Sequence, residues 1–407
     1  MRGSVWTTVI VTLFFVSVIF RLGLLFLVDV LLVLIAGASH LWSRYSLAGV
    51  DYRRHFGQRY LFFGEETDLT IELVNRKPLP LPWLRTEDDF PERVDLLTGK
   101  LHPHYQPLKA TLINLLTMRW YERIRRRYRI RGSRRGLFEF GPVTLHAGDL
   151  FGFTRQEERL SEIDTLIVYP RLVPITRLGL PAYRPFGDFK APRRLLEDPL
   201  RFMSVRDYAP GDPFRHVHWK ATARLQRLQT RVYEPPTTQQ LMIFLDVQTL
   251  QQVYEGAIPE HLELGVSAAA SIAQHALSEG FQVGLCANST IRFSNQFVVR
   301  VSPGREPAQL PRVLEALAQV THWRVRPIED VLEAEAHRLP FGATLVVISV
   351  LQTPGVLSTL LDLKTAGYGV TLITLGDERP RPELPGIPVY PIGGRKEWYS
   401  LEGLDLA

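Results

Sequence analysis

The run LMIFLD, residues 241–246, decides the fold class of the C-terminal half of the chain. Its uninterrupted apolar side chains, closed by an aspartate, predict a buried strand that ends at a polar edge. The runs FQVGLCA (281–287) and TLVVISV (344–350) have the same character. Strands without polar alternation are typical of a parallel sheet that is covered on both faces.

Segments with helical periodicity separate these strands. The other predicted elements are helices at Glu260–Glu279, Pro307–Val320 and Ile328–Arg338, a helix ending at Ala366, and a strand at Gly369–Leu375. Apolar strands that alternate with amphipathic helices predict an α/β domain with a doubly wound, mostly parallel sheet. We place this domain at residues 201–407.

A β-rich domain precedes the α/β domain. The runs TDLTIELV (67–74) and FEFGPVTL (138–145) have strand length, and the segment NRKPLPLP (75–82) breaks one strand from the next. We predict a β-sandwich-like domain at residues 46–180, followed by a linker or strap at residues 181–200 that contains several prolines. The chain of 407 residues is therefore expected to be multidomain.

Two apolar runs open the chain. VWTTVIVTLFFVSVIF covers Val5–Phe20, and LLFLVDVLLVLIAGA covers Leu24–Ala38. Together they fit a transmembrane helical hairpin, with helices at about 5–20 and 24–42, better than one crossing or a cleaved signal peptide. Each run is short for a full crossing and Asp29 is costly in lipid, so a re-entrant or interfacial hairpin remains an alternative.

The charges beside the two runs indicate the topology. Arg2 precedes the first run, and Arg44, Arg53 and Arg54 follow the second, whereas Arg21 alone lies in the turn. Positive residues collect on the cytoplasmic side of membrane proteins. We therefore expect a protein of the cell membrane. Residues 1–45 form its two-pass anchor, and its soluble body lies in the cytoplasm.

Composition limits the class of protein only loosely. The chain has 45% hydrophobic and 22% charged residues, which is ordinary for a folded protein. Its one cysteine, Cys286, excludes an internal disulfide and agrees with a reducing compartment. The net charge of +6 suits an anionic membrane surface, nucleic acid or simply an arginine-rich fold.

Much of the positive charge lies in Arg119–Arg135, which has nine arginines and one acid. Alternation within it predicts a strand with one partly apolar face and one arginine face. The apolar face has Ile124, Tyr128 and Ile130, and the arginine face has Arg125, Arg127, Arg129 and Arg131. One interpretation of the arginine face is a solvated edge whose arginines pair with acids elsewhere. The other is contact with an anionic ligand, for which we favour lipid over nucleic acid.

The stretch RDYAPGDPFRHVHWKATARLQRLQTRVYE, Arg206–Glu234, is the most distinctive of the chain. It resembles the signature of the domain of unknown function 58 family. The matching residues are Arg206, Tyr208, Gly211, Asp212, Arg215, His218, Trp219, Ala223 and Arg224. The segments Arg134–Phe138, Gly141–Val143 and Asp149–Gly152 are similar to the turn-rich β region of that family.

This resemblance implies an α/β domain like the von Willebrand factor A domain and a partnership with a MoxR-type AAA+ ATPase. Such domains usually bind Mg²⁺ through Asp-x-Ser-x-Ser after the first strand, because a hard cation needs several oxygen ligands. Here Asp246 is kept, but Gln248 and Leu250 stand where hydroxyls belong, although Thr249 could contribute. We therefore expect no metal and no other cofactor.

The other motifs give no catalytic signal. His216 and His218 could bind a metal together with Asp212, but no third ligand is convincingly spaced. A metal-dependent enzyme that uses Asp246 with His216 and His218 is the alternative function. Phosphate-loop, zinc-helix and nucleophile-elbow motifs are missing. We assign no catalytic residue. We expect Arg206, Asp207, Asp212, Arg215 and Arg224 to form a partly buried ion-pair cluster. The signature residues as a set are expected to be structural or to bind a partner.

The resulting hypothesis is a membrane-tethered adaptor or scaffold with a cytoplasmic protein-interaction domain, working with a MoxR-type AAA+ ATPase. The lipid bilayer is its other expected partner. The sequence leaves the oligomeric state and the docking surface open.

Overall fold

The computed structural model describes most of the 407 residues. The described residues are 12–15, 19, 23–149, 155–178, 202–209, 214–233, 240–291, 298–340, 342–376, 384–399 and 404–406. The chain divides into two compact units, Met1–Arg171 and Leu172–Ala407, called unit 1 and unit 2 below. The predicted linker at residues 181–200 lies outside the described residues.

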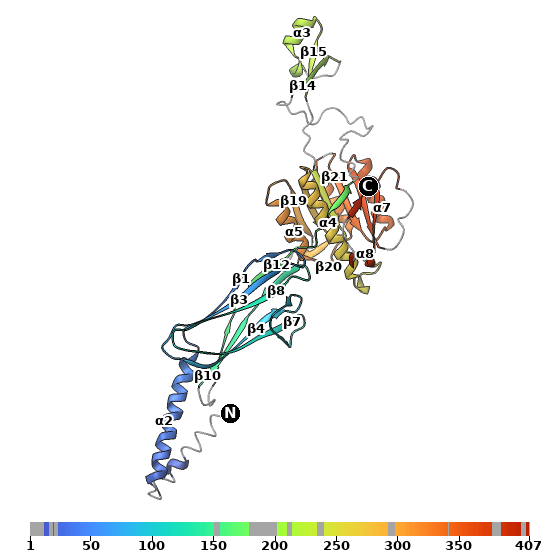
Figure 1. Ribbon diagram of the computed structural model, residues 1–407. Coiled ribbons are helices and arrows are strands. Elements are labelled where there is room, and N and C mark those ends of the chain that lie inside the picture. Colours follow the sequence, from blue (N-terminus) through green and yellow to red (C-terminus); the bar gives the residue numbers. More distant parts are fainter. Residues whose placement is uncertain are drawn as a thin grey trace. The chain divides into compact units, whose positions relative to one another are not determined.

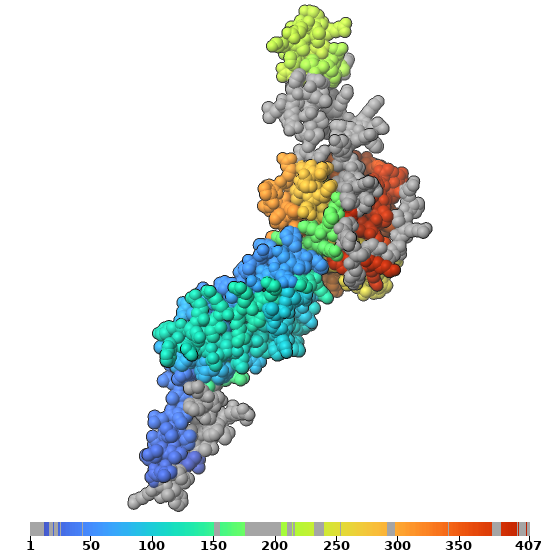
Figure 2. All heavy atoms as spheres, in the orientation of Figure 1, coloured from blue at the N-terminus to red at the C-terminus, as the bar shows by residue number. Residues whose placement is uncertain are grey.

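Unit 1 begins with one long apolar helix, α2 (Gly23–Ser46). Its segment Phe26–Ser46 is long and apolar enough to cross a membrane. Where the structure describes the chain it holds one such helix, and of the predicted first helix it describes only residues 12–15 and 19, which are helical. The space-filling view shows α2 as a narrow blue column at the lower end of unit 1 (Figure 2).

Helix α2 is tied to the β-rich part of unit 1 at two levels. The Ser39 hydroxyl donates a buried hydrogen bond to the Asp149 carboxylate. At the C-terminal end of the helix, Lys77 Nζ donates to the carbonyl oxygens of Ser46 and Ala48 at 2.6 and 2.8 Å. Farther toward the helix N-terminus, Asp29 is buried and accepts no hydrogen bond from the described residues.

The β-rich part of unit 1 has three sheets, and Figure 1 labels most of their strands. The strand orders are β1-β3-β8-β5, β11-β10-β4-β7-β6 and β2-β12-β9. The strands of the first sheet are β1 (Val50–Phe56), β3 (Glu66–Asn75), β8 (Arg123–Arg131) and β5 (Asp95–Leu96). Those of the second are β11 (Arg155–Leu160), β10 (Val143–Gly148), β4 (Leu81–Pro91), β7 (Lys109–Met118) and β6 (Leu101–Pro103). Those of the third are β2 (Tyr60–Leu61), β12 (Asp164–Val168) and β9 (Gly136–Phe140).

All three sheets contribute side chains to one core. Leu69 and Ile71 come from β3, Leu84 and Phe90 from β4, and Phe140 from β9. The predicted strand at residues 67–74 is confirmed as β3, whose burial alternates along most of its length. The predicted run 138–145 is two strands, because Gly141 and Pro142 interrupt it and Pro142 has no N–H to donate to a ladder.

Unit 2 has a six-stranded sheet of order β19-β17-β16-β21-β22-β23. Its strands are β16 (Gln240–Leu245), β17 (Gln282–Ala287), β19 (Val299–Gly304), β21 (Thr344–Ser349), β22 (Gly369–Leu375) and β23 (Val389–Gly393). All neighbouring pairs are parallel except β17 and β19. The strands predicted around residues 241, 281, 344 and 369 are therefore confirmed, while the antiparallel edge strand β19 was not predicted.

Helices cover both faces of this sheet. They are α4 (Pro259–Ser278), α5 (Gln309–Gln319), α6 (Ile328–Ala336) and α7 (Pro354–Thr365), at the predicted positions. Phe244 and Val347 pack with α6 and α7. On the other face Gly265 of α4 lies so close to Leu245 and Leu375 that a Cβ there would clash with Leu375. The doubly wound α/β prediction holds in this coarse form.

The remaining elements of unit 2 are short. Strand β13 (Ile175–Leu178) pairs with β24 (Leu404–Leu406), so residues that fall in the predicted 46–180 domain belong to the second compact unit. Strand β18 (Ser289–Ile291) pairs with β20 (Val320–Arg324). A hairpin of β14 (Phe202–Asp207) and β15 (Gln229–Tyr233) encloses η2 (Phe214–His216) and α3 (Trp219–Leu225).

Candidate functional site

The polar edge of the α/β sheet lies where β16 and β21 end. The chain leaves β16 for β17 on one side and returns to β21 on the other side, so the carboxyl ends of β16 and β21 flank a topological switch point. Ligands of open α/β sheets bind at such points. Three polar side chains meet here: Asp246 after β16, Asn288 after β17 and Ser349 at the end of β21.

The Asp246 carboxylate is buried and already bonded within the protein. Its Oδ1 accepts from Asn288 Nδ2 at 2.8 Å and from the Gln248 backbone N–H at 3.1 Å, and its Oδ2 accepts from the Ser349 hydroxyl at 2.8 Å. Burial raises the pKa of the Asp246 carboxyl, although these hydrogen bonds and the charge of Arg324 oppose the shift. The arrangement fixes three strand ends to one another.

The residues at this edge do not fit a Mg²⁺ site. The Asn288 amide directs its Nδ2 at Asp246, and its Oδ1 accepts from the Val247 N–H. The Thr249 hydroxyl accepts from the Ile258 N–H, and the Gln248 side-chain nitrogen donates to two backbone carbonyls. A cation that needs six oxygens would meet N–H donors at Asp246 Oδ1 and the Ser349 hydroxyl at Oδ2, which is too few oxygen ligands.

The signature stretch forms the hairpin of β14 and β15, called the signature hairpin below. His218 N donates to the Gln229 carbonyl at 2.8 Å, and the Thr222 hydroxyl accepts from Gln229 N at 3.0 Å. Asp207 accepts from the Gln229 amide, and the Tyr208 and Phe214 rings lie 5.6 Å apart. Contacts within the hairpin therefore give several of the signature residues a structural role.

Several predicted members of the signature cluster cannot be placed. Gly211 and Asp212 lie outside the described residues, and so does the side chain of Arg215. Arg206 donates to the Asp207 backbone carbonyl. Ala223 and Arg224 are exposed on α3, so the predicted ion-pair cluster stays a prediction.

The two histidines of the metal hypothesis have different environments. His218 is the N-cap of α3, and its Nδ1 accepts from the Ala221 N–H at 3.1 Å. An N-cap acceptor cannot carry a proton at that nitrogen. His216 ends η2, and within the described residues no group of three or more His, Cys, Asp or Glu could hold a metal ion.

The arginine face of the predicted basic strand is present on β8. Ile124 and Tyr128 are half-buried and Ile130 is buried, while the alternate arginines are exposed. Arg125 pairs with Glu72, and Arg129 and Arg131 pair with Glu66. Arg127 lies opposite Thr70 of β3. Lipid contact through this face stays a prediction.

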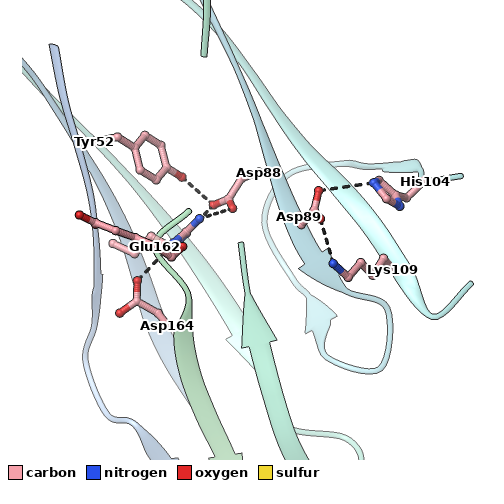
Figure 3. Close-up of polar contacts among 8 residues, drawn as sticks. Tyr52, Asp88, Asp89, His104, Lys109, Glu162 and Asp164 are labelled. Atoms are coloured by element: carbon pink, nitrogen blue, oxygen red, sulfur yellow. Dashed lines mark hydrogen bonds and ion pairs between the residues drawn. The ribbon is translucent and has the colours of Figure 1, made fainter. Parts of the chain in front are cut away.

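Unit 1 also contains a buried polar cluster that the sequence does not predict (Figure 3). Arg54 of β1 donates through Nε and Nη2 to the two Asp88 oxygens of β4 at 2.8 and 2.6 Å. Nη1 also donates to Asp164 and to the Glu162 carbonyl. The Tyr52 hydroxyl donates to Asp88 at 2.6 Å.

This cluster joins all three sheets of unit 1. It also shows that one predicted juxtamembrane charge, Arg54, is a buried residue of the β-rich part, because its side chain is only 1% exposed. Burial lowers the pKa of Arg54, yet the hydrogen bonds and charge of Asp88 outweigh burial, so the net pKa is raised and the guanidinium stays charged. Tyr52, near Arg54 in sequence, gave no signal, because its partner Asp88 lies on a distant strand.

Cys286 is expected to be inert in the folded chain. Burial, with a smaller contribution from Glu335, raises the pKa of its thiol to about 12. At mildly alkaline pH the native protein should therefore resist iodoacetamide, which reacts with thiolates, and should be alkylated rapidly only in denaturant. Because the folded pKa is raised, the stabilisation from the neutral thiol is lost as the pH rises toward about 12. Rapid alkylation of folded protein would contradict this burial.

Comparison with known proteins adds a family match to this geometry. Residues 204–391 match the model of DUF58, a protein of unknown function. The matched region contains the signature hairpin and the sheet from β16 to β23. A curated relative, the uncharacterized protein YeaD of Bacillus subtilis, is 26% identical over 258 residues. The alignment covers 60% of this chain and 57% of YeaD.

Solved structures resemble the chain only weakly. Proximal thread matrix protein 1 from the mussel byssus has a TM-score of 0.30 and 15% identity, over 40% of this chain and 46% of its own. The sporulation control protein Spo0M of Bacillus subtilis has a TM-score of 0.19 and 13% identity, over 30% and 49%. Similarities of this size carry no functional argument.

Proposed function

We propose that this protein is a membrane-tethered adaptor whose DUF58 region, a domain of the von Willebrand factor A type, binds a MoxR-type AAA+ ATPase. The observation that carries the proposal is the surface of the signature hairpin. Its exposed large apolar side chains are Phe214, Trp219, Leu225 and Leu228. Aromatic side chains of this kind are the usual anchors of protein interfaces.

The charge of the hairpin favours an acidic partner surface. Lys220, Arg224, Arg227 and Arg231 are exposed beside the apolar side chains, and among the described residues of the hairpin Asp207 is the exposed acid. Opposite charges at the rim of an interface speed association and select the partner. A partner with an apolar pocket and an acidic rim is the complement of this hairpin.

The closed polar edge of the α/β sheet supports binding over catalysis. The Asp246 carboxylate accepts hydrogen bonds from Asn288, from Ser349 and from the Gln248 backbone N–H, so it serves to hold the sheet edge in shape. The topology with Asp246 after the first strand of the sheet supports the von Willebrand factor A-type assignment. In this proposal the nucleotide chemistry belongs to the ATPase.

The membrane part of the proposal is a two-pass anchor with the body in the cytoplasm. Helix α2 supplies one crossing by length and composition. The first apolar run, Val5–Phe20, supplies the second, and Arg2 and Arg44 lie at the two outer ends. The bilayer then holds the adaptor where its ATPase partner works.

Replacing Trp219 by alanine is expected to reduce recovery of the ATPase at least tenfold. A buried interface tryptophan often contributes 2 kcal/mol or more, and about 1.4 kcal/mol corresponds to tenfold. Tagged full-length protein is solubilised in mild detergent with a slowly hydrolysed ATP analogue, and co-purified AAA+ ATPase is quantified by mass spectrometry.

Trp323→Ala is the matched control. Trp323 lies on β20, outside the signature hairpin, and is 61% exposed against 64% for Trp219. It should leave the recovery unchanged. If Trp219→Ala recovers as much ATPase as the unsubstituted chain, the hairpin is excluded as the docking surface. If the unsubstituted chain recovers no AAA+ ATPase, the proposed partner is refuted.

A further inference from the structure

The turn between β7 and β8, residues 119–122, presents two bulky aromatic side chains to solvent. Trp120 is 65% and Tyr121 is 67% exposed. Tyr121 has φ 51°, a left-handed conformation that a large side chain rarely adopts. The position would suit glycine or asparagine for turn formation alone, so the aromatic side chain requires another explanation.

Hydrogen bonds connect this turn, through Lys77, to the end of α2. Tyr121 N donates to the Lys77 carbonyl, and Asn75 Nδ2 donates to the Arg119 carbonyl at 2.8 Å. Lys77 Nζ in turn donates to the Ser46 carbonyl at the last residue of α2. One residue, Lys77, therefore separates the aromatic turn from the end of the apolar helix.

Positively charged side chains also lie around the turn. Arg119 and Arg123 are exposed at its two ends, and Arg76, which pairs with Asp51, lies next to Lys77. Glu122 is the acid within the turn, and its carboxylate accepts from the Arg119 N–H. Tryptophan and tyrosine beside arginine and lysine are the side chains that collect at the headgroup level of a bilayer.

We propose that the turn at residues 119–122 is a second membrane contact, in which Trp120 and Tyr121 lie among the lipid headgroups at the end of α2. The inference rests on the proposed membrane tether and adds a contact from the folded body. Continuity with the end of α2 favours lipid over a protein partner, because the turn meets the bilayer as soon as α2 is inserted. Contact at this turn would fix the orientation of unit 1 on the membrane.

The test uses the full-length chain in vesicles with an environment-sensitive fluorophore at Arg119→Cys, which leaves both aromatic side chains in place. The vesicles contain phosphatidylcholine and phosphatidylglycerol, with a nitroxide on lipids near the headgroup. We expect severalfold stronger quenching at position 119 than at Tyr105→Cys. Tyr105 is exposed and precedes the other end of β7, whose ten residues span roughly 30 Å.

Further variants separate the inference from the tether. Adding Trp120→Ser and Tyr121→Ser to Arg119→Cys should reduce the quenching severalfold, and a label at Leu41→Cys in α2 reports insertion of the helix. Quenching at Leu41 without quenching at position 119 would overturn the turn contact and leave the tether standing. Failure of the chain to float with vesicles would refute the tether and this inference together.

Discussion

Replacing Asp88 by alanine is expected to lower the free energy of unfolding of unit 1 by about 3–5 kcal/mol. The substitution leaves Arg54 buried with only Asp164 as a carboxylate partner. A guanidinium cannot escape the cost by losing its proton. Because Arg54 and Asp88 join β1 to β4, the loss should appear first in those strands.

Thermal unfolding of the full-length protein in detergent, with hydrogen exchange of the β1 and β4 peptides, measures this effect. The matched control is Arg76→Ala, which removes an exposed pair with Asp51 and should cost at most about 1 kcal/mol. Replacing both Arg54 and Asp88 by leucine should recover part of the loss, since no unpaired charge remains. Equal effects of Asp88→Ala and Arg76→Ala would disprove the importance of burial.

Two aspartates in α2, Leu31→Asp with Leu34→Asp, are expected to prevent this helix from crossing the membrane. Each charge at the centre of a membrane helix costs about 2.5–3.5 kcal/mol, so the pair costs about 5–7 kcal/mol. With the proposed two-pass anchor, the first run still crosses and the body is carried to the other side. A reporter fused after Ala407 should then change sides.

The control for the two aspartates is Leu115→Asp, an exposed apolar position on β7, which should leave the reporter in the cytoplasm. Two other results are informative. A body released into the cytoplasm would show that α2 alone forms the anchor. A body still attached and cytoplasmic would show that α2 is not a crossing segment.

The α/β elements were predictable because their signal is local. Five apolar residues at 241–245 and the uninterrupted runs of β21 and β22 are buried on both faces, so no other pattern competes with strand. The edge strand β19 escaped prediction because it is partly exposed and follows a segment without regular periodicity. Its antiparallel direction is a property of the assembled sheet.

The polar clusters were not predictable because their members are far apart in sequence. Asp246, Asn288 and Ser349 come from the ends of three strands, and only the sheet topology brings them together. Arg54 lies near an apolar helix in sequence and therefore resembled a juxtamembrane charge. The prediction of a poor metal site has a local basis, because Gln248 and Leu250 stand at the hydroxyl positions after Asp246.

The two attachments of α2 have a mechanical consequence. Ser39 is bonded to Asp149 and Ser46 to Lys77, and these positions are about 10 Å apart along the helix axis. A helix held at two points cannot swivel about its last residue. Torque that a partner applies to unit 1 would therefore be transmitted to α2 as tilt, and the anchor would act as a stiff lever within the bilayer.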